Sequence, residues 1–312
     1  MGSSTNGEFK TVLVTGGTDG LGRATAILLA SEGYRVFAAG RNSQKRAALE
    51  QFAEEHKFSL ETLDLDVTSD ESASRAIAEI ERRAGRVDVL VNNAGIAIAG
   101  VMEEVSLDDL RKQFETNVFG AVRMAQRVLP RMRERRCGRI INMSSIAGQV
   151  SNPLIGPYSG SKHALEAISD AMRLELASFG IRVVIIEPGI IPTNINRAGA
   201  ELSSRYIGNA AASPYARVYF GFLKTWQQRV SAAKATPDDC ARVILHAIRA
   251  ESPKARYRVT RDAKVTFALR WLLPDRQFDG LILRTMGLHD GAASAPDSER
   301  IQAQIQEMMR SL

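Results

Sequence analysis

The sequence predicts an α/β fold with a doubly wound parallel sheet, formed by a single domain that ends in a helical extension. Strand-like and helix-like segments alternate along most of the chain. The strand-like runs are almost wholly apolar, as in a parallel sheet that helices cover on both faces. A glycine-rich turn follows the first of these runs. We expect the sheet domain over residues 11–260, a flexible N-terminus over 1–10 and the helical extension over 261–312.

Each element follows from a local pattern. β-branched and apolar runs predict the strands, at residues 11–15, 34–39, 58–63, 87–91, 139–143, 181–186 and 256–260. Apolar residues at helical spacing predict the helices, at residues 20–31, 43–55, 69–83, 106–135, 157–178 and 236–250. Ser69 is expected to cap its helix, with Ser72 as the alternative. Pro130 marks the place where the long helix could bend.

Residues 194–231 interrupt this alternation and are rich in aromatic side chains, among them Tyr206, Tyr219 and Trp226. A long irregular aromatic segment is typical of a lid or a pocket wall. Ordinary packing against the domain explains the aromatic residues equally well. We expect a substrate lid here, and three short amphipathic helices over residues 261–312, one of them beginning at Pro274.

Composition narrows the class of protein. The 312 residues can bury a large core, and 45% hydrophobic and 24% charged residues are typical of a soluble globular protein. Cys137 and Cys240 suggest neither a disulfide framework nor a zinc site, and they fit a reducing compartment, so we expect a cytoplasmic protein. The four histidines have no metal-ligand spacing, so no bound metal is expected.

The formal charge of +6 could indicate nucleic acid, an anionic membrane surface or an anionic cofactor. No recognised nucleic-acid motif is present, and we expect no nucleic-acid partner. The first ten residues lack the apolar core of a signal peptide. No uncharged apolar run reaches the roughly 18 residues of a transmembrane helix, so none is expected.

A glycine-rich loop joins the first strand to the first helix, with the sequence Thr15-Gly16-Gly17-Thr18-Asp19-Gly20-Leu21-Gly22. Its glycines let the backbone turn tightly and approach a pyrophosphate, whose charge the helix N-terminus attracts. A plain turn is the alternative. The position directly after an N-terminal strand favours a dinucleotide site in a Rossmann fold.

The end of the second strand bears on cofactor choice. NAD-selective sites carry a carboxylate here for the ribose 2′-hydroxyl, and Gly40 leaves that place empty. Arg41 can instead bind a 2′-phosphate, so NADP(H) is favoured over NAD(H). A solvated loop arginine is the alternative. Asp19 argues mildly for NAD(H), because its charge would lie near the same phosphate.

Three more strands end in segments that suit a cofactor. Asp66 could accept a hydrogen bond from an adenine amine, or it could cap a helix. The small residues of Asn92-Asn93-Ala94-Gly95 allow a cofactor to lie against the backbone. The segment Pro188-Gly189-Ile190-Ile191-Pro192-Thr193 would bring backbone amides and a hydroxyl to a nicotinamide amide.

Tyr158 and Lys162 are four residues apart on a predicted helix and therefore share one face of it. There the ammonium can lower the pKa of the phenol from its reference of about 10, so that the tyrosine exchanges protons near neutral pH. Ser145 precedes Tyr158 by 13 residues, at a strand end. Asn117 lies among apolar residues in the long helix, either as a satisfied core residue or as part of a site.

In this order and spacing, the motifs resemble those of the short-chain dehydrogenase/reductase family over roughly residues 11–260. The resemblance implies a catalytic tetrad of Asn117, Ser145, Tyr158 and Lys162. Ser145 would orient a carbonyl, Tyr158 would protonate it, Lys162 would hold the nicotinamide ribose, and Asn117 would position a water. The cofactor contacts that it implies are Gly16, Thr18, Asp19, Gly20, Leu21, Gly22, Arg41, Asn42, Asp66, Val67, Asn93, Ala94, Gly95, Tyr158, Lys162, Pro188, Gly189, Ile191 and Thr193.

A finer resemblance, to the 17β-hydroxysteroid and retinol dehydrogenase branch, rests on residues 161–167, 178–183 and 273–276. It implies an NADP(H)-dependent oxidoreductase that interconverts a ketone or aldehyde and an alcohol on a lipophilic substrate such as a steroid, retinoid or polycyclic ketone. The substrate contacts expected from it are Ser145, Val150, Leu154, Tyr158 and Tyr206.

Other functions remain open at this point. A β-ketoacyl thioester reductase is one alternative, although its relatives usually end near the last strand. A non-catalytic NADPH-sensing protein is another, although such proteins often lack a tetrad member. The family implies a homodimer formed through the helices of Asn117 and Tyr158. The basic, amphipathic helix at residues 301–309 leaves a peripheral membrane contact open, with docking on the body as the preferred alternative.

Overall fold

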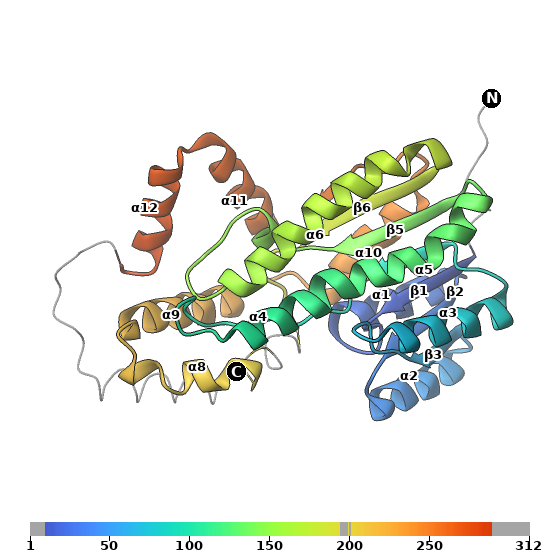
Figure 1. Ribbon diagram of the computed structural model, residues 1–312, viewed down its shortest axis with the longest axis horizontal. Helices are drawn as coiled ribbons and strands as arrows, with labels where there is room; N and C mark the ends of the chain where they lie inside the picture. Colours follow the sequence, from blue (N-terminus) through green and yellow to red (C-terminus); the bar gives the residue numbers. More distant parts are fainter. Residues whose placement is uncertain (1–9, 194–198, 200, 289–312) are drawn as a thin grey trace.

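The computed structural model describes residues 10–193, 199 and 201–288. Within them, parallel strands form one sheet in the order β3-β2-β1-β4-β5-β6-β7 (Figure 1). The strands are β1 Thr11–Thr15, β2 Arg35–Gly40, β3 Leu60–Asp64, β4 Val89–Asn92, β5 Gly138–Met143, β6 Ile181–Glu187 and β7 Arg256–Arg258. The predicted doubly wound sheet is therefore confirmed.

Helices cover both faces of this sheet (Figure 1). The helices of the sheet domain are α1 Gly20–Ser31, α2 Ser43–His56, α3 Asp70–Ala84, α4 Leu107–Phe114, α5 Gly120–Glu134, α6 Gly156–Glu175 and α10 Pro237–Arg249. Ser69 caps α3 as predicted, because its hydroxyl accepts a hydrogen bond from the Ser72 backbone N–H.

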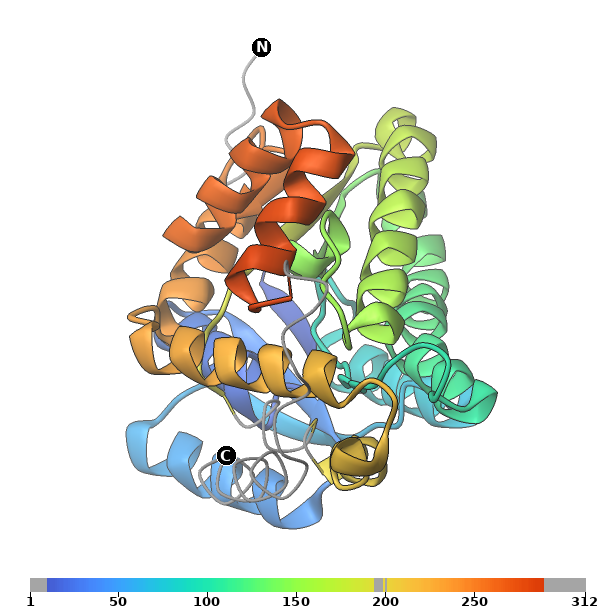
Figure 2. The same ribbon diagram turned by 90° about the vertical axis from the view of Figure 1, so that its left-hand side faces the viewer.

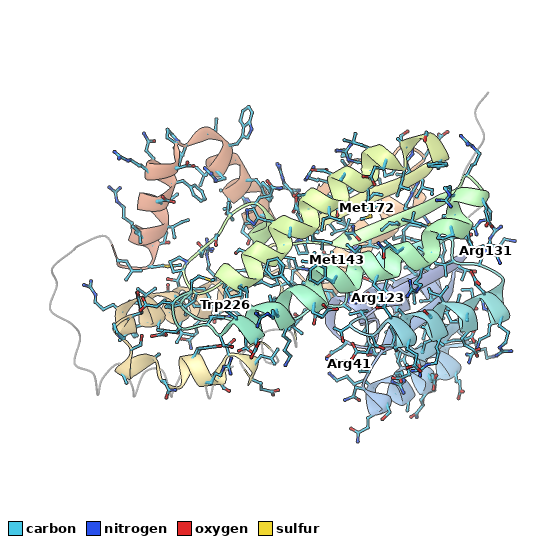
Figure 3. The ribbon with its side chains drawn as sticks, in the orientation of Figure 1. Arg41, Arg123, Arg131, Met143, Met172 and Trp226 are labelled. Carbon is cyan, nitrogen blue, oxygen red and sulfur yellow. The ribbon has the colours of Figure 1, made fainter. Side chains whose placement is uncertain are left out.

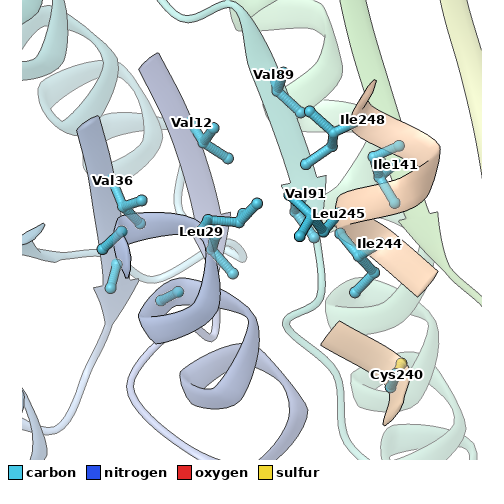
Figure 4. Close-up of a cluster of buried hydrophobic side chains, with 14 of the residues drawn as sticks. Val12, Leu29, Val36, Val89, Val91, Ile141, Cys240, Ile244, Leu245 and Ile248 are labelled. Atoms are coloured by element: carbon cyan, nitrogen blue, oxygen red, sulfur yellow. The ribbon is translucent and has the colours of Figure 1, made fainter. Parts of the chain in front are cut away.

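Successive residues of the central strands enter opposite cores, which explains why these strands are apolar throughout. In β1, Val12 packs in the core under α1, α2 and α10, and Leu13 packs in the core under α3 and α5. Figure 4 shows the first core, where Leu29 of α1 and Ile244 of α10 face the sheet. Burying each such aliphatic side chain stabilises the fold by about 1.5–3 kcal/mol.

The predicted long helix at residues 106–135 is present, but its hydrogen-bond pattern changes in the middle. Residues Glu115–Phe119 form a π-helical segment between α4 and α5. The predicted bend site, Pro130, lies inside α5. The irregularity therefore lies at Asn117, and π-helical turns of this kind occur frequently at functional sites.

The segment at residues 194–231 was predicted to be irregular, and this prediction was wrong for its described part. It contains α8 Ser204–Ile207, a 3-10 turn at Ala210–Ala212 and α9 Ala216–Ala232. Its aromatic residues form a third buried cluster, which includes Tyr206, Tyr219 and Phe222. The predicted start of the segment, residues 194–198, lies outside the described residues.

The C-terminal extension begins with α11 Arg261–Leu272 and α12 Asp275–Thr285, which lie beside each other above the body (Figures 1 and 2). Pro274 immediately precedes α12, as predicted. The end of α12 packs on α9, because the Thr225 hydroxyl donates to the Thr285 carbonyl and Met286 joins the third cluster. The predicted helix at residues 301–309 lies outside the described residues.

Candidate active site

The predicted motifs meet at the carboxyl edge of the sheet, because parallel strands all end there. Asn93 connects two of these motifs, the segment after β4 and the glycine-rich loop, through hydrogen bonds. Its side-chain amide donates hydrogen bonds to the carbonyls of Thr15 and Gly16, at 3.0 and 3.1 Å. The Thr15 hydroxyl in turn accepts from the backbone N–H groups of Asn93 and Ala94. The segment after β4 therefore fixes the shape of the glycine-rich loop after β1.

The glycines of the loop are required by its geometry. Gly16 and Gly20 have φ values of +62° and +49°, which L side chains rarely adopt. A Cβ at Gly17 would lie 2.7 Å from the Val14 carbonyl oxygen. A Cβ at Gly22 would collide with the Gly16 carbonyl oxygen and with the Asn93 side chain. The loop is thus a bare backbone cradle at the N-terminus of α1, and it fits a pyrophosphate.

Asp19 does not face a phosphate as a free carboxylate. It caps α1 by accepting from the Gly20 N–H at 2.8 Å, and it forms an ion pair with Lys45 at the start of α2. The capping role satisfies a helix N–H that would otherwise lack a partner. Because Lys45 offsets its charge, Asp19 is a weaker argument for NAD(H) than its sequence position suggested. Lys45 was not among the predicted cofactor residues.

Arg41 directly follows the last residue of β2 and is labelled in Figure 3. Its side chain is 69% exposed, and its guanidinium lies 3.7 Å from the Asp66 carboxylate. Neighbouring Arg46 is more constrained, because it donates to the Gly40 carbonyl and pairs with Asp64. Asn42 uses its side-chain oxygen to cap α2. Arg41 is therefore more exposed and less constrained than Arg46 at this strand end.

Asp66 and Val67 lie where an adenine would be expected, at the turn after β3. The Asp66 carboxylate accepts hydrogen bonds from the N–H and hydroxyl of Thr68, at 3.0 and 2.8 Å. Burial alone would raise the pKa of Asp66, but these bonds and the Arg41 charge outweigh it and hold the pKa below the usual range. The Val67 carbonyl accepts from Arg123 at 2.7 Å. Both residues keep this turn rigid.

Tyr158 and Lys162 lie one turn apart on α6, as predicted. The Lys162 ammonium is buried, donates to the Met143 carbonyl at 2.6 Å and lies 5.6 Å from the centroid of the Tyr158 ring. The Tyr158 hydroxyl is hydrogen-bonded with Ser145, which begins the turn after β5. These three side chains therefore meet at the end of β5, as their spacing predicted.

The pKa values correct one expectation. Burial raises the pKa of Tyr158, and the hydrogen bond with Ser145 offsets this only in part. Burial lowers the pKa of Lys162 to about 8, although the charge of Glu166 acts in the opposite direction. The prediction that Lys162 acidifies the phenol was therefore wrong for the ligand-free site. Burial is the largest contribution to the pKa of Tyr158, and the hydrogen bond with Ser145 is the contribution that acts against it.

Asn117 is buried in the π-helical segment, and its side chain already has partners. Its Oδ1 accepts from the Ile96 N–H at 2.8 Å, and its Nδ2 donates to the Ile96 carbonyl and to the Ser161 hydroxyl. Ser161 in turn donates to the Tyr158 carbonyl at 2.7 Å. The side chain thus anchors the segment after β4 to α6.

The segment after β6 lies close to the glycine loop. A Cβ on Gly20 would lie 3.6 Å from the Cβ of Thr193. The Pro188 carbonyl accepts from the Ile146 N–H at 2.8 Å, which joins this segment to the turn that Ser145 begins. The Gly189 N–H donates to the Thr260 hydroxyl. Ile191 is buried in the core under α1 and α10.

The three predicted substrate-wall residues differ in their surroundings. Val150 is buried beside the turn that holds Ser145, and Leu154 is buried in the third cluster. Tyr206 is also buried there, and its hydroxyl donates to Asp109 at 2.8 Å. A surface hollow of about 460 Å³ borders Tyr206 and Arg205, and no tetrad residue lines it. Tyr206 therefore has a packing role.

Sequence reasoning also missed the carboxylate behind the tetrad. Glu166 lies one turn after Lys162 on α6, it is 3% exposed, and it accepts a hydrogen bond from Ser144 at 2.7 Å. A glutamate four residues after Lys162 was the only signal, and such spacing is common on solvated helices. Within residues 10–193, 199 and 201–288, no group of side chains could hold a metal ion. None of the described helices could cross a bilayer.

Comparison with known proteins identifies the family. A family model described as short chain dehydrogenase matches residues 10–202, a range that includes the glycine loop, Ser145, Tyr158 and Lys162. The chain belongs to the short-chain dehydrogenase family. It is therefore an oxidoreductase, and the predicted family is confirmed.

Relatives of this short-chain dehydrogenase extend over most of its length. It is 33% identical to the probable short-chain type dehydrogenase/reductase VdlC of Helicobacter pylori, over 86% of this chain and 95% of that protein. It is 33% identical to the NADPH-dependent 3-dehydrocapnine reductase of Ornithobacterium rhinotracheale, over 88% and 96%. It is 37% identical to the 3-ketodihydrosphingosine reductase of Bacteroides thetaiotaomicron, over 62% and 69%.

The solved structures agree with this assignment. A short-chain dehydrogenase from Streptomyces avermitilis has 31% sequence identity and a TM-score of 0.71, over 90% of this chain and 98% of that one. The dehydrogenase thus shares its fold with that protein over a larger part of the chain than the family model matches.

Proposed function

We propose that this dehydrogenase is an NADP(H)-dependent oxidoreductase that interconverts a ketone or aldehyde and an alcohol on a lipophilic substrate. The observation that carries the proposal is the meeting of three side chains. The Tyr158 hydroxyl is hydrogen-bonded with Ser145, one helical turn from the buried ammonium of Lys162. They lie at the same sheet edge as the glycine cradle before α1.

Bound in this cradle, a nicotinamide cofactor supplies the hydride in reduction and accepts it in oxidation. In reduction, the Ser145 hydroxyl orients the carbonyl oxygen, and Tyr158 transfers its proton to the alkoxide that develops there. The raised pKa of Tyr158 keeps the phenol protonated and ready to donate. The Lys162 ammonium then stabilises the tyrosinate that forms, because an opposite charge favours the ionised phenol.

The pH dependence of reduction follows from these groups. The rate is expected to fall above a pH of about 8, because Lys162 loses its charge there while Tyr158 keeps its proton. Tyr158 and Lys162 are both active in their protonated forms, so the reduction rate falls on the alkaline side of the pH profile. kcat/KM for a ketone, measured from about pH 6 to about pH 10, checks this. A Lys162→Arg variant should lack the fall, whereas a flat wild-type profile would contradict the assignment.

We propose NADP(H) over NAD(H) because Gly40 leaves no carboxylate at the end of β2, where Arg41 is exposed. Arg41→Ala should raise KM for NADPH by about tenfold to a hundredfold, the loss of one charge-assisted hydrogen bond. KM for NADH should change little. Arg111→Ala, which removes a similarly exposed arginine from α4, is the matched control. An equal loss for both cofactors would refute a phosphate contact.

The lipophilic substrate is supported by relatives named for reduction of 3-dehydrocapnine and of 3-ketodihydrosphingosine. The apolar residues Val150 and Leu154 follow Ser145 in the chain, and we propose them as a pocket wall. The steroid, retinoid and polycyclic ketones implied by the 17β-hydroxysteroid and retinol dehydrogenase branch belong to the same proposal.

The decisive assay is a substrate panel with NADPH and NADH. It contains 3-ketodihydrosphingosine, a steroid ketone, retinal and a β-ketoacyl thioester, and it follows oxidation of the reduced cofactor. Turnover of the lipophilic carbonyls with NADPH supports the proposal. Turnover of the thioester alone favours the β-ketoacyl reductase alternative. NADPH binding without any turnover favours the non-catalytic sensor, and a preference for NADH overturns the role of Arg41.

We further propose a homodimer formed through the helices that carry Asn117 and Tyr158. Large apolar side chains are exposed on these helices, namely Leu107 of α4, Phe119 of the π-helical segment and Leu174 of α6. Apolar exposure of this kind is typical of an interface. Light scattering of the purified chain tests the proposal. We also propose a cytoplasmic location, supported by a sequence with only two, widely separated cysteines, Cys137 and Cys240.

A further inference from the structure

A buried carboxylate network lies directly behind the tetrad, and its centre is Glu166 on α6. Its Oε1 accepts from the Ser144 hydroxyl at 2.7 Å. Its Oε2 accepts from Gln149 Nε2 at 2.5 Å and from Arg256 Nε at 3.1 Å. Glu166 therefore links α6 to both ends of the turn that contains Ser145, and to β7.

Glu187 at the end of β6 is the second carboxylate of this network, and it is fully buried. Among the described residues, neither carboxylate oxygen of Glu187 has a hydrogen-bond donor. The guanidinium Nε atoms of Arg256 and Arg258 lie 3.6 Å away. A buried carboxylate without hydrogen bonds is costly, and a proton held on the group removes that cost.

We propose that Glu166 and Glu187 share one proton, and that the pair, held by Arg256, positions Ser145 and Lys162. The kinetic part of this proposal rests on the proposed function. The pair contacts the active site from two sides. Ser144, bound by Glu166, directly precedes Ser145. Glu187 directly precedes Pro188, whose carbonyl accepts from the Ile146 N–H.

The packing around Glu166 leaves little freedom. A Cβ on Gly148 would lie 2.6 Å from Glu166 Oε1 and 2.5 Å from the Ser144 hydroxyl. The turn that follows Ser145 is thus pressed against the carboxylate. A change in length or charge at Glu166 would therefore move the residue that orients the substrate carbonyl. Glu166 acts through Ser144 and Lys162, so it is a positioning residue.

Charged groups lie beside the pair on α6 and on β7. Lys162 and Asp170 lie on α6, and Arg256 and Arg258 lie on β7. Arg256 also pairs with Asp170 at 2.6 Å. Burial raises the pKa of Glu187, and the charge of Glu166 raises it further. A raised folded-state pKa stabilises the fold at low pH, and this stabilisation is lost as the pH rises through neutrality.

The shared proton can be observed without any substrate. Infrared spectra of the full chain labelled with ¹³C-glutamate should contain a protonated carboxyl band at about pH 6 that disappears by about pH 8. The band should be absent in Glu187→Gln. It should persist in Asp170→Asn, the control, which also touches Arg256 but no tetrad residue. Wild-type spectra without a protonated glutamate at the lower pH would overturn the shared proton.

Stability gives a second readout. Chemical unfolding should show that the wild type loses stability between about pH 5 and about pH 8, and that Glu187→Gln loses clearly less. Its amide supplies permanently the hydrogen that the proton supplies in the wild type, and it leaves a neutral group beside Glu166. Identical pH dependence in the two proteins would contradict the proposal.

Kinetics then test the positioning role. Glu166→Gln should lower kcat by about tenfold or more, and the alkaline limb should move to lower pH, because Lys162 loses the negative charge that raises its pKa. Asp170→Asn should retain kcat within about threefold. If the alkaline limb of the pH–rate profile lies at the same pH in Glu166→Gln as in the wild type, Glu166 does not influence Lys162 and this part of the proposal is refuted. Positive infrared and unfolding results without any ketone turnover would refute the proposed function and leave the shared proton standing.

Discussion

Replacing Tyr158 by phenylalanine is expected to lower kcat for carbonyl reduction by about 10²- to 10⁴-fold, the usual contribution of a general acid. The variant keeps the aromatic ring and loses only the hydroxyl. Ser145 retains its hydrogen bond from the Ala147 N–H, so the turn after β5 keeps its shape. NADPH affinity and the thermal midpoint should therefore change little. Steady-state kinetics and a fluorescence titration with NADPH check both expectations.

Tyr215→Phe is the matched control, because it removes an exposed phenol hydroxyl that donates to Glu103 and touches no tetrad residue. It should leave kcat within about twofold, since an exposed pair of this kind contributes little. Wild-type turnover in Tyr158→Phe would show that the proton comes from another group. An equal loss in both variants would place the effect in packing and not in proton transfer.

The sheet could be predicted from the sequence because its signal is local. Val12 and Leu13 belong to different cores, so both faces of β1 require apolar residues and the run is unambiguous. The glycine loop was predicted from its place directly after an N-terminal strand, whereas the close contact of Gly22 with the Gly16 carbonyl is visible only in the fold. Strand ends differed by a residue or two, because hydrogen-bonded partners decide where pairing stops.

The aromatic segment could not be predicted in the same way. Tyr219 and Phe222 lie in α9, and apolar residues on more than one side of this helix pack in the third cluster. The apolar residues of α9 therefore do not show a clear helical spacing in the sequence. The hydroxyls are satisfied by distant acidic residues, as when Tyr219 donates to Glu104 at 2.6 Å. Glu104 is far from Tyr219 in the sequence, so this partner could not be predicted from local pattern. The segment was therefore predicted to be irregular, although it forms a packed helix.

The tetrad residues were predicted by spacing, but their protonation was not. The distance from Tyr158 to Lys162 follows from the helix, whereas the burial that raises one pKa and lowers the other depends on the whole surrounding fold. For the same reason, the burial and pairing of Glu166 and Glu187 could not be predicted from the sequence. Each resembles an ordinary glutamate in sequence, and only the folded chain brings the two carboxylates against Arg256.

Gly22→Ala is expected to have the second large effect, on both cofactor binding and stability. The new methyl group would overlap the Gly16 carbonyl oxygen and the Asn93 side chain, so α1 or the glycine loop must move. Overpacking of this kind lowers the free energy of unfolding by about 1–3 kcal/mol. NADPH affinity should fall by about tenfold or more, equivalent to about 1.4 kcal/mol of binding free energy. Thermal unfolding and a NADPH titration measure the two losses.

Gly280→Ala provides the opposite case, because Gly280 also lies in a helix but has no neighbour within 4 Å of a new Cβ. Helix propensity alone favours alanine over glycine by about 1 kcal/mol at either position. Gly280→Ala should therefore raise the free energy of unfolding slightly and leave NADPH affinity unchanged. If Gly22→Ala were equally harmless, the close contact of α1 with Gly16 and Asn93 could not be what shapes the cradle, and the phosphate site would need another explanation.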